Sequence, residues 1–183
     1  QLSLRTITII PRMIRQIRKI GDPVLRRKAK KVEKVTPEIR KLIDDMLETM
    51  RAQRGIGLAA PQVGIALRVA VVEVEKDEDT PGSGQTYVLV NPELAKTSAE
   101  EDENQEGCLS IPGWRGMVQR PSRVTVRAMD REGNRVKIDA EGYVARAFQH
   151  EIDHLDGVLF TDKLTAPDRI WRVDENAPDN QPE

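Results

Sequence analysis

The only two histidines of the chain lie four residues apart, in the segment His150-Glu151-Ile152-Asp153-His154. Residues with this spacing lie on one face of a helix, so both imidazoles can point at the same metal ion. Glu151 follows the first histidine and can approach a ligand of that ion from the side. The spacing therefore predicts a metal site with a proton-transferring carboxylate beside it. The alternative is a solvated helix face, but the apolar Ile152 requires this helix to be packed and partly buried.

Cys108 is the candidate for a third ligand. Catalytic zinc-like centres usually have three protein ligands and keep one position for water. Cys108 is the only cysteine of the chain, and a glycine before it allows close approach of the backbone. A lone cysteine is more often a small buried hydrophobe, but two histidines that lack a third ligand favour ligation.

The segment from Gly55 to Gly64 is rich in glycine and could be mistaken for a nucleotide-binding loop. That fingerprint needs a strand before it and a helix after it, whereas here a helix precedes and Pro61 with Gly64 discourages another. We therefore reject nucleotide binding. Gln62 is the chemically useful residue, because its amide can donate a hydrogen bond to a developing oxyanion. Taken alone, such a glutamine is more often an ordinary polar loop residue.

Two amphipathic helices are expected around these residues. Thr36 can cap a helix with Pro37 in its first turn, and apolar residues then recur at helical spacing as far as Met50. A second helix is predicted over residues 141–156, where it carries the histidine pair and stops at Gly157.

Strands are expected between the helices. Turn residues and polar segments separate the β-branched runs, so neighbouring strands should pair in the antiparallel sense. We predict an α+β domain with mainly antiparallel β-sheets packed around a C-terminal metal-binding helix, together with an N-terminal amphipathic helix. The expected strands are 69–74, 87–90 (closed by Asn91-Pro92), 124–128 and 136–138, and the expected loops are 55–64, 76–85 and 100–103.

Composition excludes several classes of protein. The chain has 183 residues and a net charge of -1, so no global field favours nucleic acid or an anionic membrane as a partner. No apolar run is long enough to cross a bilayer. One cysteine cannot form an internal disulfide, which suits a reducing compartment. We expect a cytoplasmic protein.

Three parts are expected along the chain. Residues 1–12 form an N-terminal extension, residues 13–166 the catalytic domain and residues 167–183 a polar tail that frays. The extension contains Arg, Ser and Thr but no acidic residue, so a remnant of an organellar transit peptide is the alternative to upstream sequence.

Three separated segments resemble the motifs of the peptide deformylase family, and they occur in the family's order. The opening segment from Ile17 to Arg26 also resembles the family's N-terminus, so the resemblance covers about residues 13–164. Together these motifs are very specific. They are Gly55-Ile56-Gly57-Leu58-Ala59-Ala60-Pro61-Gln62, Glu106-Gly107-Cys108-Leu109-Ser110 and Gln149-His150-Glu151-Ile152-Asp153-His154-Leu155.

The resemblance implies a metallohydrolase that removes the N-terminal formyl group from methionine on new polypeptides. Its partners would be N-formylmethionyl peptides on ribosome-associated nascent chains, and it would be a monomer or weak oligomer. One divalent ion would be bound, with Fe(II) as the usual native metal and Zn(II), Ni(II) or Co(II) as possible occupants. Cys108, His150 and His154 would be the ligands, and Glu151 the catalytic acid and base.

The resemblance also implies residues that bind the substrate. Arg146 departs from the apolar residue that many bacterial members have at this place, which leaves the shape of the methionine pocket open. The implied set is Gln62 and the backbone N–H of Leu109 for the oxyanion, Ile56 and Gly57 for the substrate backbone, Arg115 beside the cleft, and Tyr143, Arg146 and Ala147 around the methionine pocket.

Charged residues near the ligands are expected to orient them. We nominate Glu106 and Asp153, with Arg120 as a partner for Asp153. Surface salt bridges are an equally good interpretation of these three residues.

Two other functions fit parts of the sequence. A zinc endopeptidase would use the same helix with a downstream carboxylate as third ligand, and Glu175, next to Asp174, has a compatible spacing. Both residues lie in a polar segment with little sign of a packed helix. A non-catalytic module that holds nascent N-termini would bind peptides without releasing formate, and Glu151 argues against it.

Overall fold

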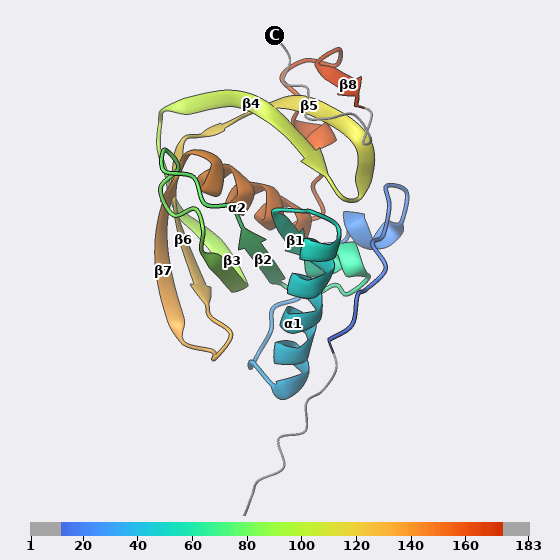
Figure 1. The fold of residues 1–183 in the computed structure, drawn as a ribbon, viewed down its shortest axis with the longest axis vertical. Coiled ribbons are helices and arrows are strands. Elements are labelled where there is room, and N and C mark those ends of the chain that lie inside the picture. The colour runs from blue at the N-terminus through green and yellow to red at the C-terminus, as the bar shows by residue number, and fades with distance from the viewer. Residues whose placement is uncertain (1–11, 174–183) are drawn as a thin grey trace, which may run out of the picture.

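The structure, a computed structural model, describes residues 12–173 of the chain (Figure 1). Of the predicted extension 1–12, only Arg12 lies within this range. Of the predicted tail 167–183, residues 174–183 lie outside it. Among the described residues, no helix is long and apolar enough to span a membrane. The elements are η1 (Pro23–Arg26), α1 (Pro37–Ala52), β1 (Gly57–Ala59), η2 (Ala60–Val63), β2 (Val69–Glu73), β3 (Thr86–Thr97), β4 (Glu101–Cys108), β5 (Ile111–Pro121), β6 (Arg123–Met129), β7 (Arg135–Glu141), α2 (Gly142–Leu155), η3 (Phe160–Lys163) and β8 (Ile170–Arg172), where η marks a 3-10 helix.

The strands form two antiparallel sheets. A five-stranded sheet has the order β1-β2-β3-β6-β7, and a three-stranded sheet has the order β4-β5-β8. Figure 1 shows α2 between the arch of β4 and β5 and the strands β1, β2 and β3. The predicted α+β class, with a C-terminal helix packed between mainly antiparallel sheets, is therefore confirmed.

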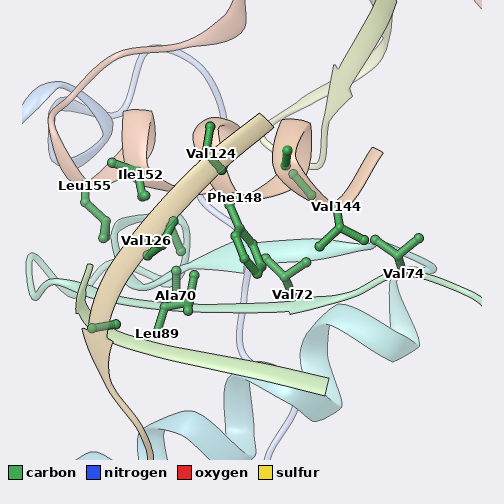
Figure 2. Close-up of a cluster of buried hydrophobic side chains, with 14 of the residues drawn as sticks. Ala70, Val72, Val74, Leu89, Val124, Val126, Val144, Phe148, Ile152 and Leu155 are labelled. Carbon is green, nitrogen blue, oxygen red and sulfur yellow. The ribbon is translucent and has the colours of Figure 1, made fainter. Parts of the chain in front are cut away.

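Strand β2 of the five-stranded sheet is buried on both faces. Side chains alternate along a strand, so Ala70 and Val72 face one side and Val69 and Val71 the other. The first pair belongs to an apolar cluster with α2, and the second pair to a cluster with α1. In Figure 2 the ring of Phe148, from α2, lies against Val72. This packing holds α2, and the residues on its other face, in a fixed place.

Both predicted helices form close to their predicted bounds. The Thr36 hydroxyl accepts a hydrogen bond from the Ile39 N–H at 3.4 Å and caps α1, with Pro37 in the first turn. α2 ends just before Gly157, whose φ of +77° lies in the left-handed region.

Several predictions about loops were wrong. β3 continues through Asn91, which has a φ of 52° and sits at a register shift, so the polar Asn-Pro pair marks a bulge rather than an end. The acidic segment 100–103 belongs mostly to β4, because its exposed edge tolerates carboxylates. Segment 55–64 contains β1 and η2.

The three-stranded sheet was largely missed. Its strand β5 contains Gly113 and Gly116 and lacks a clear alternation of apolar residues. β8 lies inside the segment predicted to fray and pairs with β5 through Arg115 and Trp171. The boundary predicted at residue 166 therefore lies within the fold.

Gly157 offers a test of how α2 is anchored. A Cβ at this position would lie 2.6 Å from the backbone oxygen of Arg26, whereas Gly142, which also has a positive φ, has open space around it. An alanine in the left-handed region costs about 1–2 kcal/mol, and overpacking adds about 1–3 kcal/mol. We expect Gly157→Ala to lower the free energy of unfolding in urea by about 2–5 kcal/mol, and Gly142→Ala by only about 1–2 kcal/mol. Equal losses would contradict the contact with Arg26.

Candidate metal centre

Three metal-binding atoms converge between β4 and α2. Cys108 ends β4, and His150 and His154 lie on the face of α2 that is turned away from the five-stranded sheet. The Cys108 Sγ lies 3.3 Å from His154 Nε2, which lies 3.2 Å from His150 Nε2. All three ligand atoms lie within 4.8 Å of one another. The structure thus brings together the three residues predicted as ligands.

These separations fit a tetrahedral metal ion. With metal–nitrogen bonds of about 2.0 Å and metal–sulfur bonds of about 2.3 Å, the ligand atoms of a tetrahedral site are about 3.3–3.5 Å apart. The thiolate and the two imidazole nitrogens also form one of the ligand sets that suit a catalytic ion, because three protein ligands leave a position for water. The residues therefore fit a divalent metal.

The electrostatics of the site favour a positive charge at its centre. Burial alone raises the pKa of the Cys108 thiol, but the neighbouring imidazoles of His154 and His150 lower it well below its usual range. Burial alone lowers the pKa of His150, but the hydrogen bonds with Cys108 and Glu106 raise it well above its usual value. The lowered pKa leaves Cys108 as a thiolate, and a metal ion would meet the same negative charges, on Cys108 and Glu106, that favour the proton on His150.

Glu151 is buried beside the ligands. Burial is the main reason why its pKa is raised to about 7. Among the described residues its Oε2 has no hydrogen-bond partner, so this oxygen is available to a water molecule or a substrate. A Cβ at Gly57 would collide with Glu151 Oε1 and lie 2.8 Å from its Cδ. The glycine therefore makes room for the carboxylate.

Gln62 has a fixed orientation next to the thiol. Its Oε1 accepts the Ala59 N–H at 2.9 Å, which directs its Nε2 toward Cys108 Sγ at 3.4 Å and toward Ser110 Oγ at 3.2 Å. Leu109 occupies the turn between β4 and β5, and its carbonyl accepts a hydrogen bond from Lys19 Nζ at 2.8 Å. The structure thus places both residues predicted to bind the oxyanion beside Cys108.

A buried ion cluster supports His150. Glu106 Oε2 lies 2.9 Å from His150 Nδ1, and Arg120 binds both oxygens of Glu106, at 2.5 Å and 2.8 Å. Arg120 also donates to Asp153 Oδ2 at 2.8 Å. The side chains of Glu106 and Arg120 are only 4% and 3% exposed, so this pair is no surface salt bridge. The three residues nominated from sequence lie in one network.

The resemblance places Arg146 around the methionine pocket, and the structure shows its guanidinium bound within the ion cluster. Its guanidinium binds Glu106 Oε1 at 2.9 Å, the Val118 carbonyl at 2.9 Å, and the carbonyl and carboxylate of Asp102 at 2.8 Å and 3.0 Å. The charged end therefore faces the ion cluster rather than an apolar pocket. Asp102 was missed because the sequence reads as an acidic loop there, and only the pairing of β4 with β5 places it beside α2.

The other residues predicted to bind substrate lie around the same centre. Gly57 begins β1, an edge strand of the five-stranded sheet, and Ile56 precedes it. Ala147 is buried in α2 next to Arg146, and Tyr143 is 44% exposed near the start of that helix. The Arg115 side chain packs closely over Gly107.

The alternative third ligand cannot be placed. Asp174 and Glu175 lie outside the described residues. Within residues 12–173 the cysteine completes the only group of three metal-binding side chains that come together.

Glu106 should control how tightly His150 holds a metal. We expect Glu106→Gln to weaken metal binding by about 10- to 100-fold, because the amide is a poorer acceptor for the His150 N–H and a poorer partner for Arg120. Competition with a chromogenic chelator would measure the change. Glu103→Gln is the matched control, since Glu103 lies on the same strand and its partners, Arg169 and Thr165, are exposed. Equal affinities in the two variants would contradict this role.

Comparison with known sequences gives a consistent result. The family model described as polypeptide deformylase matches residues 14–169. A peptide deformylase of Halothermothrix orenii is 54% identical over 150 residues, which cover 81% of this chain and 92% of the relative. One of Natranaerobius thermophilus is 47% identical over 163 residues, which cover 89% of this chain and 98% of the relative.

Solved structures agree. The peptide deformylase of Ehrlichia chaffeensis in complex with actinonin superimposes with a TM-score of 0.81 and 42% identity, covering 86% of this chain and 92% of that one. A class I type b peptide deformylase from Acinetobacter baumannii, with Met-Ala-Ser bound, gives a TM-score of 0.79 and 34% identity, covering 84% and 100%. The motifs, the metal-binding triad and these matches together show that the chain belongs to the peptide deformylase family.

Proposed function

We propose that this chain hydrolyses the N-terminal formamide of N-formylmethionyl peptides at the centre formed by Cys108, His150 and His154. Membership of the peptide deformylase family makes it a metal-dependent hydrolase of this class. The observation that carries the residue assignment is the convergence of the three ligand atoms beside the buried carboxylate of Glu151. The products are formate and a free amino terminus.

Glu151 moves the protons of this reaction. A metal held by the triad would lower the pKa of a bound water molecule and polarise the formyl oxygen. Glu151 accepts a proton from the attacking water and later gives it to the departing amine. A pKa raised by burial suits this exchange, because a group that must both take and give a proton works best near the ambient pH. The confined space beside Gly57 keeps the carboxylate in place.

Gln62 and the backbone N–H of Leu109 stabilise the oxyanion that forms when water adds to the formyl carbon. The Gln62 amide is preoriented by Ala59, so its N–H groups need no rearrangement when charge develops. The Ser110 hydroxyl oxygen accepts a hydrogen bond from the Gln62 amide and so keeps this amide next to Cys108.

The substrate backbone lies along β1. The free edge of this strand, at Ile56 and Gly57, can pair with an extended peptide. Tyr143 and Ala147 border the methionine side chain, and Arg115 lies beside the cleft. The Met-Ala-Ser bound to the Acinetobacter baumannii relative has the sequence that removal of formate from formyl-Met-Ala-Ser would leave.

Metal, compartment and partners follow from the same family. Fe(II) is the proposed native ion, and Zn(II), Ni(II) or Co(II) could replace it in a Cys-His-His site. The relatives named above are bacterial, which favours the cytoplasm and nascent chains at the ribosome as the source of substrate. We propose a monomer or weak oligomer. The organellar alternative depends on residues 1–12, and residues 1–11 lie outside the described part of the chain.

Formate release tests the function and the role of Glu151 together. Anaerobically purified protein loaded with Fe(II) or Ni(II) should release formate from formyl-Met-Ala-Ser. Glu151→Gln should lower kcat by more than about 1000-fold, which exceeds the loss of one oxyanion donor, yet retain the metal. Cys108→Ala should lose both the bound metal and the release of formate. If a folded, metal-loaded wild-type protein releases no formate, the proposed function is wrong. That result would favour a peptidase with Glu175 as third ligand, or a module that only binds peptides.

Gln62 should affect the rate rather than substrate binding. We expect Gln62→Leu, which keeps the volume but removes the donor, to lower kcat by about 100- to 1000-fold with little change in KM. Ser110→Ala should have a smaller effect, because it removes only the hydroxyl that positions the amide. Steady-state kinetics of both variants at equal metal content would separate effects on kcat from effects on KM. A rise in KM at unchanged kcat would show that Gln62 only binds substrate.

A further inference from the structure

The metal ligands come from two parts of the fold that share little apolar contact. Cys108 belongs to the three-stranded sheet, and the histidines belong to α2. The apolar cluster of α2 contains residues of the five-stranded sheet but none of β4, β5 or β8. The cluster beneath β5, around Ile111 and Val118, contains no residue of α2. Among the described residues, the ring of Phe160, from the cluster beneath β5, stacks on His150 with centroids 6.4 Å apart. Apart from this contact, the hydrophobic clusters hold the cysteine and the histidines separately.

Polar contacts span this gap, and Arg146 makes more of them than its neighbours do. From α2 it reaches Asp102 and Glu106 on β4 and the Val118 carbonyl on β5. Its side chain is 4% exposed, so these bonds are shielded from water. Gln149 adds a single bond across the same gap, from its amide to the Pro121 carbonyl at 3.0 Å.

We propose that Arg146 is a positioning residue that sets the placement of Cys108 relative to His150 and His154, and so determines how firmly this enzyme holds its metal. The proposal rests on the metal centre proposed above. Glu106 lies between Arg146 and His150, so the same guanidinium also restrains the carboxylate that orients the first histidine.

The shape of the side chain matters as much as its charge. A guanidinium is planar and has donors that diverge, so it can bind two strands at once, whereas an ammonium group is a single point charge. Arg146 Nη1 is shared between Glu106 and Val118, and its Nη2 is used by Asp102. A lysine at this place could keep one of these contacts but not all of them.

Loss of Arg146 would not leave Glu106 without a counter-charge. Arg120 still binds both carboxylate oxygens, which predicts that the centre forms but is held less firmly. The residue therefore modulates the site rather than forming it.

Cobalt-substituted protein provides a test that does not depend on turnover. The rate at which Co(II) passes to a chelator measures how firmly the site holds the metal, and the thiolate-to-cobalt charge-transfer absorption reports the geometry at Cys108. We expect Arg146→Met to release cobalt at least about 10-fold faster than wild type and to shift this absorption. Arg146→Lys should release cobalt at a rate between those of wild type and Arg146→Met. KM for formyl-Met-Ala-Ser should stay unchanged.

Arg68→Met is the matched control. Arg68 is also a buried arginine at α2, but it binds the end of the helix, at the Leu155 carbonyl and Asp156, and the Pro92 carbonyl on β3. Its loss should lower the unfolding temperature without changing the cobalt absorption or release. This variant separates a general loss of stability from a specific effect on the ligands.

Three results would overturn the proposal. Arg146→Met could match Arg68→Met in both cobalt measurements, which would make the role purely structural. KM could rise at unchanged cobalt release, which would place Arg146 in the methionine pocket. If Arg146→Met does not fold, the test uses Arg146→Lys instead. A rate of cobalt release from Arg146→Lys equal to that of the wild type would then contradict the proposal. Wild-type protein that binds cobalt but releases no formate would instead refute the proposed reaction.

Discussion

A carboxylate buried with little access to water shapes the surroundings of the metal centre. Glu106 is almost fully enclosed, and an ionised carboxylate in such a place is stable only if it is paired and hydrogen-bonded. Burial alone raises its pKa, but Arg120 and His150 lower it far below the usual range, so the group stays charged. Meeting that requirement draws β4, β5 and α2 together at one point. The orientation of His150 follows from the same bonds.

The two faces of α2 are stabilised by different forces. One face packs apolar side chains such as Phe148 against the five-stranded sheet, and the other carries the histidines and the charged network. Apolar packing depends on shape and volume, whereas the ion network depends on a complete set of partners. Substitutions on the first face should therefore change stability in graded steps, and those on the second should alter the chemistry of the site before they unfold the protein.

Sequence could predict the parts whose signals are local. The pair His150 and His154, the cap at Thr36 and the stop at Gly157 each depend on a few neighbouring residues, and the structure agrees with them. The three-stranded sheet could not be predicted in this way, because β4 is polar, β5 is interrupted by glycines, β8 has only three residues, and only their pairing defines them. The hydrogen-bond partners of Arg146 were missed for the same reason, since they lie about 28 to 44 residues away.

The separation of the two apolar clusters has a consequence for motion. Units that share few buried apolar contacts can open independently, at a lower cost than unfolding of the whole domain. The β4–β5 hairpin could therefore detach from α2 while the five-stranded sheet keeps its structure, and Cys108 would leave the histidines in that opening. Amide exchange in β4 should then be faster in the metal-free protein than in the metal-bound one, while exchange in β2 stays slow in both. Retention of the metal in this enzyme would report a local equilibrium at one hairpin rather than the global stability of the fold.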